Sequence, residues 1–273
     1  MHFFDNPRPL VFAHRGGCAL GPENTLAAFD LGMAAGADGL ELDVHLSSDG
    51  IVVVHHDFTL DRTTDASGPI VARTAAELGA VNAGNGLSVS KPAPSAMVTG
   101  DSPGSMTGVP TLRDVLRRYA TTPIIVEMKV DTERMGVAVA EEIKTAGAVG
   151  RVCAAGFGGR SLGAVREALP ALATSASQWE VRLALYRTWA HWPVRDARYG
   201  GYQVPERAGT LRVVSPQFIR YAHDAGFKVQ VWTVDDPGDM LRLLEWGVDA
   251  LITNRPDVAV EVRDGFVKRS RRT

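Results

Sequence analysis

The chain has 273 residues, of which 45% are hydrophobic and 22% charged, so it can bury a sizeable core and fits a single α/β barrel. Its net charge of −2 argues against a broad nucleic-acid-binding surface, and no apolar run approaches the roughly 20 residues that span a bilayer. Cys18 and Cys153 are too few for a disulfide framework and lack metal-ligand spacing. The N-terminal stretch carries an early acid and prolines, unlike a signal peptide, so we expect a cytoplasmic protein.

The first elements of the chain form a βαβ unit. An apolar run at residues 9–13 predicts a strand. The next segment predicts a helix that begins at Asn24 or Thr25, either of which can cap it, and that stops at Gly36. A second strand follows at residues 39–44.

Two acids occupy one face of that second strand. Glu41 and Asp43 are two residues apart and alternate with apolar residues, so both carboxylates point to the same side of the sheet. Burying both without a cation would be strongly unfavourable, which implies a metal ion or a cluster of Arg and Lys side chains. The alternative is an edge strand with a solvated polar face. We favour the cation because the histidines of VVVHHD follow closely in the chain.

Three histidines lie near these acids in the chain. The polar stretch at residues 45–50 is too short for a crossover helix, so a tight turn joins the strands on either side of it. Strand alternation lets only one of His55 and His56 face the site, and we expect His56 to do so and His55 to face outward. His45, in the turn, is either a supporting partner of the site or a solvated residue. The other histidines are expected at the surface: His2, His191 and His223.

Residues 58–109 interrupt the regular pattern. The stretch is rich in Gly, Ser, Pro and Ala and has little periodicity. We interpret it as a rim insertion within one domain that spans residues 1–273. Inside it, TAAEL predicts a short helix, and residues 84–108 are expected to be partly disordered.

Strands and helices alternate again after this insertion. The segment at residues 179–205 has no clean period and is interpreted as a helix followed by an irregular rim segment. The basic ending at residues 267–273 is expected to be a frayed tail. The other predicted elements are a helix at 111–120 capped by Thr111, a strand at 123–130, a helix at 133–147, a strand at 151–157, a helix at 161–170, a strand within 171–177, a strand at 210–215, a helix at 216–226, a strand at 227–236, a helix at 237–247 and a strand at 249–254. This many units argue for a parallel sheet closed into a barrel.

Polar side chains gather where the predicted strands end, which is where α/β barrels place their chemistry. These residues are His14, Glu41, Asp43, His56, Glu127, Lys129 and Trp232. Three carboxylates without a thiolate favour a hard cation such as Mg²⁺ or Ca²⁺. Histidine can also bind metal, which leaves a transition metal such as Mn²⁺ open.

A series of short motifs runs from His14 to Asp257. The motifs are HRG at 14–16, PENT at 22–25, ELDV at 41–44, HD at 56–57, RTT at 62–64, PTL at 110–112, E-x-K at 127–129, WTV at 232–234 and D-x-L-x-T-N-R-P at 249–256. In this order they resemble the glycerophosphodiester phosphodiesterase family. A lone HRG would be a weak signal, whereas the ordered set is highly specific.

The resemblance implies a TIM-type (β/α)8 barrel with a small insertion after the third strand. It implies hydrolysis of a small-molecule glycerophosphodiester to sn-glycerol 3-phosphate and an alcohol, with a divalent metal. The implied roles are metal binding by Glu41, Asp43 and Glu127, acid and base catalysis by His14 and His56, phosphate binding by Arg15 and Lys129, and a glycerol contact by Trp232. The chemistry agrees, because the reaction needs neutralised phosphate charge and two proton transfers.

Some implied roles have structural alternatives. Lys129 could instead be an ion-pair partner of Glu127, and Trp232 could be a core residue. Four residues of the segment at 179–205 either form the outer wall of the pocket or belong to an irregularly packed connection. They are Trp189, Trp192, Tyr202 and Gln203.

Three features depart from the family pattern. Asp235 stands where the family often has asparagine, and Asn254 stands where aspartate is common. The segment at 151–157 lacks the serine-phenylalanine ending often seen there. None of these departures is at the position of one of the three acids or the paired histidines.

Two other functions compete with hydrolysis of a glycerophosphodiester. A lyase of the sphingomyelinase D type would use the same scaffold on intact lipids, but it would need an exposed apolar rim and usually a secreted, disulfide-stapled chain. Neither feature is visible in the sequence. A non-catalytic phosphoglycerol-binding barrel would be favoured by loss of an acid or a histidine, and all of them are present.

Overall fold

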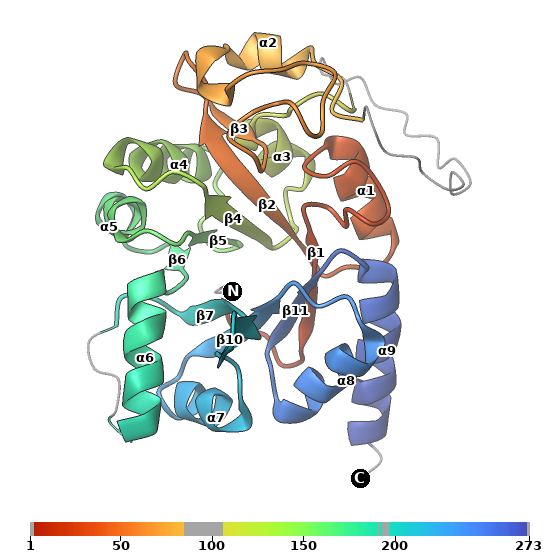
Figure 1. The fold of residues 1–273 in the computed structure, drawn as a ribbon, viewed down its shortest axis with the longest axis vertical. Coiled ribbons are helices and arrows are strands. Elements are labelled where there is room, and N and C mark those ends of the chain that lie inside the picture. The colour runs from red at the N-terminus through yellow and green to blue at the C-terminus, as the bar shows by residue number, and fades with distance from the viewer. Residues whose placement is uncertain (1–2, 85–105, 191, 193–196, 272–273) are drawn as a thin grey trace.

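The computed structural model describes residues 3–84, 106–190, 192 and 197–271. Within them, eight parallel strands form the wall of a barrel (Figure 1). Short apolar strands suit this wall because both of their faces are covered, one by the barrel interior and one by helices. The strands are β1 (Leu10–His14), β2 (Gly39–Leu46), β4 (Ile124–Met128), β5 (Val152–Ala155), β6 (Ala173–Thr174), β7 (Gly201–Pro205), β10 (Lys228–Trp232) and β11 (Ala250–Thr253).

The strand order around the barrel is β6, β5, β4, β2, β1, β11, β10 and β7. The two ends of this order meet through a parallel bridge between Ser175 and Gly201, so the ring is nearly closed. His14 pairs in register with Glu41, and Asp43 pairs with Glu127. This register brings the polar strand ends to the same level, and the predicted (β/α)8 barrel is confirmed.

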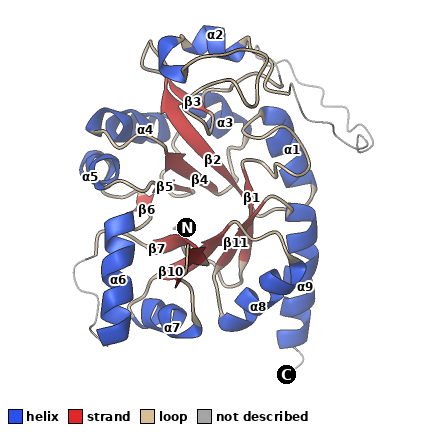
Figure 2. Ribbon diagram, viewed as in Figure 1, coloured by secondary structure: helices blue, strands red, loops and turns tan. Residues whose placement is uncertain are grey.

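Helices cover the outside of the barrel (Figure 2). Several begin at a Thr or Ser whose side chain accepts a hydrogen bond from the first turn, as predicted for Thr25 and Thr111. Inside the barrel, the N-terminal Phe3 packs against Phe12 with ring centroids 5.8 Å apart, so aromatic rings fill the interior. The helices are α1 (Leu26–Ala34), α3 (Leu112–Arg118), α4 (Glu133–Thr145), α5 (Gly159–Ala168), α6 (Gln178–Ala190), α7 (Pro216–Asp224), α8 (Pro237–Trp246) and α9 (Pro256–Ser270).

A small layer extends from one end of β2 (Figure 1). β3 (Val52–Val54) pairs antiparallel with β2, and the 3-10 helix η1 (Ile70–Ala72) and α2 (Ala75–Gly79) follow it. Leu60, Ile70 and Leu78 are fully buried in an apolar cluster of this layer. The predicted tight turn and short helix are confirmed. Most of the stretch that we expect to be partly disordered lies outside the described residues.

The prediction of an irregular segment up to residue 205 was wrong, because β7 is part of the barrel wall and pairs with β10. The strand predicted at 210–215 is only the short β9 (Leu211–Arg212), which forms a hairpin with β8 (Arg207–Ala208) outside the wall. Glycine has low strand propensity, which hides β7 in the sequence. The structure needs Gly200 because a Cβ there would lie 2.4 Å from the ring of Phe4.

The position of β7 can be tested by stability measurements. Tyr202 is fully buried in β7, whereas Leu211 in the hairpin is 40% exposed. We expect Tyr202→Ala to lower the free energy of unfolding by about 3–5 kcal/mol and Leu211→Ala to change it by less than about 0.5 kcal/mol. Urea unfolding of both variants checks this. If Leu211→Ala lowered the free energy of unfolding more than Tyr202→Ala did, the result would indicate that the hairpin, and not β7, is part of the barrel wall.

The basic tail is solvated as expected from residue 268 to residue 271, but residues 267–270 are not frayed, because they continue α9 to Ser270. Residues 272–273 lie outside the described residues. Arg263 on this helix is buried and forms an ion pair with Asp38. The pair ties the helix to the segment that precedes β2. Separately, none of the helices in the described part of the chain combines the length and apolar character needed to cross a membrane.

Candidate active site

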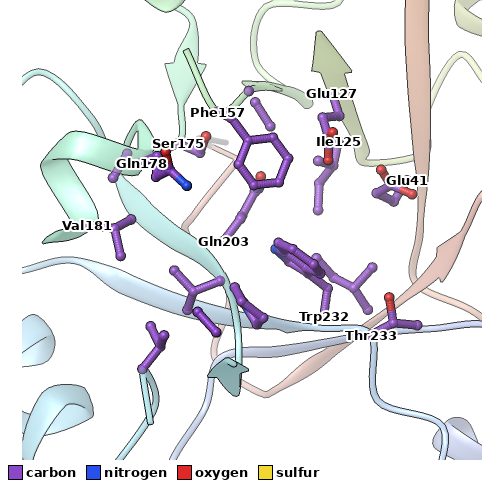
Figure 3. Close-up of a pocket in the computed structure, with 18 of the residues that line it drawn as sticks. Glu41, Ile125, Glu127, Phe157, Ser175, Gln178, Val181, Gln203, Trp232 and Thr233 are labelled. Atoms are coloured by element: carbon purple, nitrogen blue, oxygen red, sulfur yellow. The ribbon is translucent and has the colours of Figure 1, made fainter. Parts of the chain in front are cut away.

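A pocket of about 670 Å³ opens where the barrel strands end (Figure 3). Parallel strands of a barrel all end on one face, so the side chains that follow them converge there. Every residue predicted for the site lines this pocket: His14, Arg15, Glu41, Asp43, His56, Glu127, Lys129 and Trp232.

Glu41, Asp43 and Glu127 form an acidic cluster in the pocket. One carboxylate oxygen from each lies within 4.8 Å of the others. Oxygens that share a Mg²⁺ or Ca²⁺ ion at roughly 2.0–2.6 Å have this spacing. Burial, and then the charge of Asp43, raises the pKa of both Glu41 and Glu127. The cluster therefore fits a hard divalent cation, which would relieve the repulsion among the carboxylates.

The loop after β1 brings a guanidinium group to these acids. Arg15 and Gly16 have positive φ values of 52° and 88°, which turn the chain sharply. The backbone N–H of Arg15 donates to Glu41 at 3.1 Å, and its Nε lies 3.3 Å from Asp43. Gly16 has no substitute here, because a Cβ would lie 2.8 Å from Phe29 in α1. The tight packing of this loop fixes Arg15 at the edge of the acidic cluster.

A lysine that directly follows β4 contacts the cluster. Lys129 Nζ lies 2.9 Å from Glu127 and 3.4 Å from Asp43. Burial lowers the pKa of Lys129, but the two carboxylates outweigh it and the net shift is upward, so the side chain is charged. Lys129 is therefore an ion-pair partner of Glu127 and a wall residue of the pocket at the same time.

His14 is held by a chain of hydrogen bonds behind the pocket. Its Nδ1 lies 2.6 Å from Asn254 Oδ1, and Asn254 Nδ2 donates to Asp235 at 2.7 Å. Asp235 only accepts, so the amide oxygen of Asn254 faces His14 and the ring carries its proton on Nδ1. Burial lowers the pKa of His14, and the hydrogen bond to Asn254 partly offsets this. The other ring nitrogen, His14 Nε2, faces the acidic cluster and lies 3.8 Å from Glu41.

The two residues that depart from the family pattern thus contact each other. Asn254→Asp alone would place two carboxylates together, and Asp235→Asn alone would remove the acceptor of the Asn254 amide. We expect each single change to lower kcat/KM about tenfold and the double exchange to restore it, because each single change breaks the hydrogen bond that orients residue 254 toward His14. Steady-state kinetics of the three variants checks this. If the two losses in kcat/KM multiplied in the double variant, the expected restoration of activity would be contradicted.

His56 also lines the pocket and is held by a carboxylate. Its Nδ1 lies 2.6 Å from Asp57, whose carboxylate also accepts from Arg62. The hydrogen bonds from Arg62 hold the pKa of Asp57 well below its usual range, so it stays a carboxylate. The backbone of His56 is fixed as well, because its carbonyl accepts from His45 Nε2 at 3.1 Å.

The other predicted histidines fall into two groups. His45 is fully buried in β2 and is a supporting partner of the site rather than a solvated residue. His55 does not line the pocket, but it is 4% exposed and bonds to Thr59, so it does not face solvent. His223 lies at the surface as predicted. His2 and His191 lie outside the described residues.

Trp232 lines the pocket (Figure 3), and its partly buried side chain also packs against the apolar cluster of the barrel interior. Its ring packs edge to face against Phe157, with centroids 6.0 Å apart. Gln203 also lines the pocket, whereas Tyr202 is buried in the barrel wall. The predicted outer wall of Trp189 and Trp192 is not found, because both side chains are exposed on the surface.

Comparison with known proteins identifies the relatives of this site. The sequence profile of the Glycerophosphoryl diester phosphodiesterase family matches residues 14–258, which include every site residue named above. The chain belongs to this family. A glycerophosphodiester phosphodiesterase from Caldanaerobacter subterraneus is 30% identical over 264 residues, which cover 94% of this chain and 99% of that relative.

Solved structures of glycerophosphodiester phosphodiesterases share the fold. The enzyme from Agrobacterium tumefaciens matches with a TM-score of 0.74 at 25% identity and covers 94% of this chain and 100% of its own. A phosphodiesterase from Oleispira antarctica, in complex with the product sn-glycerol-3-phosphate, matches with a TM-score of 0.70 at 25% identity, covering 94% of this chain and 97% of its own.

Sequence reasoning missed some residues of this phosphodiesterase. Phe157 lines the pocket, and its position at the end of a predicted strand was an available signal. Arg62, within the RTT motif, binds both Asp57 and Glu23. The link between Asn254 and His14 spans 240 positions in the chain, and no local pattern indicates it.

Proposed function

We propose that this glycerophosphodiester phosphodiesterase hydrolyses a glycerophosphodiester to sn-glycerol 3-phosphate and an alcohol, with a bound Mg²⁺, Ca²⁺ or Mn²⁺ ion and two histidines as acid and base. The observation that carries the proposal is that three carboxylates and two histidines line one pocket together with Arg15 and Lys129. The relative crystallised with sn-glycerol-3-phosphate supports the same product here. We also propose that residues 58–109 are a rim insertion within a single barrel domain.

The phosphate would lie over the acidic cluster. Glu41, Asp43 and Glu127 would hold the metal, which supplies a Lewis acid for the phosphate oxygens when bound. Arg15 and Lys129 both reach Asp43, at 3.3 and 3.4 Å, and are placed to bind phosphate oxygens beside it. Fixed cations at this position stabilise the charge that builds up as the nucleophile approaches phosphorus.

The two histidines would carry the proton transfers. Each ring is anchored through Nδ1, His14 to Asn254 and His56 to Asp57, so each has Nε2 available for the substrate. One ring accepts the proton of the nucleophile, and the other donates a proton to the leaving alkoxide. Trp232, which lines the same pocket, would contact the glycerol.

The proposed reaction can be tested directly. We expect metal-stripped protein to be inactive, and we expect release of sn-glycerol 3-phosphate from glycerophosphocholine or glycerophosphoethanolamine to return on addition of Mg²⁺, Ca²⁺ or Mn²⁺. An enzyme-coupled assay for glycerol 3-phosphate gives the readout. No turnover of any diester by folded, metal-loaded protein would overturn the proposed function.

Metal binding is expected to depend on pH. Because the pKa values of Glu41 and Glu127 are raised, the metal-free cluster still holds protons at pH values where an ordinary carboxyl group has lost them. A metal must displace these protons when it binds. The metal dissociation constant should therefore rise as the pH falls through the raised pKa of Glu41, by up to about tenfold per pH unit for each proton displaced. Calorimetric titration in buffers of different ionisation enthalpy measures the protons released.

The stability of the metal-free protein should show the opposite dependence. The folded cluster binds more protons than the unfolded chain does, so stability falls as the pH rises from the ordinary carboxyl pKa toward the raised one. Thermal melts without metal, between about pH 5 and 8, check the sign. A metal dissociation constant that did not change with pH over this range would contradict the proton release expected on metal binding.

A further inference from the structure

A cluster of exposed aromatic side chains lies on and just after α6. Three of the five tryptophans of the chain fall within residues 179–192, and all three are exposed. Together with a neighbouring tyrosine they form what we call the aromatic strip. Its members are Trp179, Tyr186, Trp189 and Trp192, which are 68%, 61%, 54% and 68% exposed. Tryptophan buries most of its surface in an ordinary fold, so a cluster of exposed rings marks an interaction surface.

The aromatic strip follows one face of the helix. Trp179, Tyr186 and Trp189 are separated by seven and three residues, which places them on the same side of α6. The rings of Tyr186 and Trp189 pack edge to face with centroids 5.6 Å apart. Trp192 follows the helix, and its carbonyl accepts a hydrogen bond from Tyr221 at 2.8 Å. α6 lies at the outer edge of the barrel, and no other helix or strand of the described chain lies outside it in this view (Figure 1).

The surroundings of the aromatic strip are positively charged. Residues 178–212 contain six arginines and three acids, in a chain whose net charge is −2. Two of these acids are neutralised by arginines from outside the segment. Arg166 lies 2.8 Å from Glu180, and Arg242 lies 2.9 Å from Glu206. The segment therefore presents more positive charge to solvent than its composition alone indicates.

Several arginines of this segment are free to bind an anionic partner. Arg182, Arg198 and Arg207 are exposed, and none of them pairs with an acid in the part of the chain that the structure describes. Arg182 lies three residues after Trp179 and four before Tyr186, so it shares the face of the strip. Aromatic rings and unpaired cations thus occupy one continuous surface.

This combination fits the surface of a membrane that contains anionic lipids. Tryptophan and tyrosine rings are enriched at the level of lipid headgroups, because each has an apolar body and a polar N–H or O–H group. Anionic headgroups attract exposed arginines. Helices that lie in the plane of a membrane surface combine these two features.

Two other partners fit the strip less well. In a two-fold contact between copies of the chain, the same face of each copy would meet, and unpaired arginines would meet arginines. A nucleic acid requires a row of cations that follows its phosphates, whereas α6 places aromatic rings with Arg182 along its exposed face. Charge and composition therefore favour the membrane.

We propose that the aromatic strip docks this protein on the surface of a membrane that contains anionic lipids. The rings would lie at the level of the headgroups, and the arginines would contact the lipid phosphates. The rest of the chain is net negative, so its other faces would be repelled by the same surface. Gln178 and Arg182 also line the pocket, so docking on the strip would bring the pocket next to the membrane. The inference concerns where the protein binds and does not depend on the proposed reaction.

Cosedimentation with vesicles tests the inference. We expect the protein to bind vesicles of phosphatidylcholine mixed with an equal part of phosphatidylglycerol, to bind pure phosphatidylcholine more weakly, and to lose affinity for the mixed vesicles at high salt. Trp179→Ala and Trp189→Ala should each weaken binding to the mixed vesicles about tenfold. Arg182→Gln should weaken it about fivefold. All three positions are exposed, so thermal melts should match that of the unchanged protein.

Two variants away from α6 provide matched controls. Phe58→Ala removes a ring that is 61% exposed in the layer beyond β2, and Arg117→Gln removes an exposed charge from α3. Both should bind the mixed vesicles like the unchanged protein. The inference would be overturned if the unchanged protein did not bind these vesicles, or if the tryptophan variants bound them equally well.

Two further measurements decide between the membrane and the other partners. Analytical ultracentrifugation without lipid should give the same oligomeric state for the unchanged protein and for Trp189→Ala. A dimer that this change dissociates would assign the strip to contact between copies and overturn the inference. Titration with a fluorescent single-stranded oligonucleotide should show no binding that depends on Trp179 or Trp189. Binding that the two substitutions abolished would assign the strip to nucleic acid instead.

Discussion

Glu41→Gln is expected to lower kcat/KM for every accepted diester by about 10²- to 10³-fold or more, because the neutral amide is a poor ligand for a hard cation. The same change should stabilise the metal-free protein above neutral pH. Glutamine removes one of three carboxylates whose oxygens lie within 4.8 Å of one another. Activity and metal-free stability should therefore move in opposite directions, which a simple folding defect does not produce.

Thermal melts with and without metal check this expectation. Metal at a hundred times its dissociation constant stabilises the native protein by about 2.7 kcal/mol, and the variant should lose most of this gain. Glu142→Gln is the matched control, since Glu142 pairs with Arg113 on the outside of the barrel. If the Glu41→Gln variant kept the full metal-induced stabilisation, the result would show that Glu41 does not bind the metal.

His56→Gln is expected to lower kcat by about 10²- to 10⁴-fold while metal binding and stability stay close to those of the unchanged protein. Glutamine can hydrogen-bond like one nitrogen of the ring but cannot transfer a proton. The carboxylate partner of His56 would remain in place, because Asp57 is also held by Arg62. The loss should therefore appear in kcat rather than in KM.

A second histidine with a carboxylate partner provides the control for this variant. His223 lies 2.8 Å from Asp249 on the outside of the barrel, so His223→Gln removes a comparable pair away from the pocket. Its kcat should be unchanged. Equal and small effects of the two substitutions would assign His56 a structural role and leave one of the two proton transfers without a group.

The parts of the fold that follow from neighbouring residues could be predicted from the sequence. Glu41 and Asp43 share a face because strand side chains alternate, and Thr74 and Thr111 begin helices because their side chains cap the first turn. The site followed from the same rule, since residues at strand ends meet on one face of a barrel. All eight predicted site residues line the pocket, and the roles assigned to them stay predictions.

The parts that depend on distant residues could not be predicted. β7 is hidden by glycines that make room for Phe4, almost 200 positions earlier in the chain. The buried Arg263 keeps the C-terminal segment in a helix through Asp38, a contact across 225 positions. The sequence pattern placed His45 in a turn. Its hydrogen bond to the carbonyl of His56 forms only when β2 and β3 are paired, so the sequence does not indicate it.

One carboxylate joins the loop after β1 to the proposed rim insertion. Glu23, in the loop after β1, accepts from Arg15 at 3.0 Å and from Arg62 at 2.7 Å, and Arg62 also holds the partner of His56. Burial alone would raise the pKa of Glu23, but the two arginines outweigh it and keep the group ionised. A chimera that borrowed the insertion of a relative without a counterpart of Arg62 would leave two carboxylates short of a cation. The insertion and the loop after β1 are therefore not interchangeable modules, and they can be recombined between relatives only as a matched set.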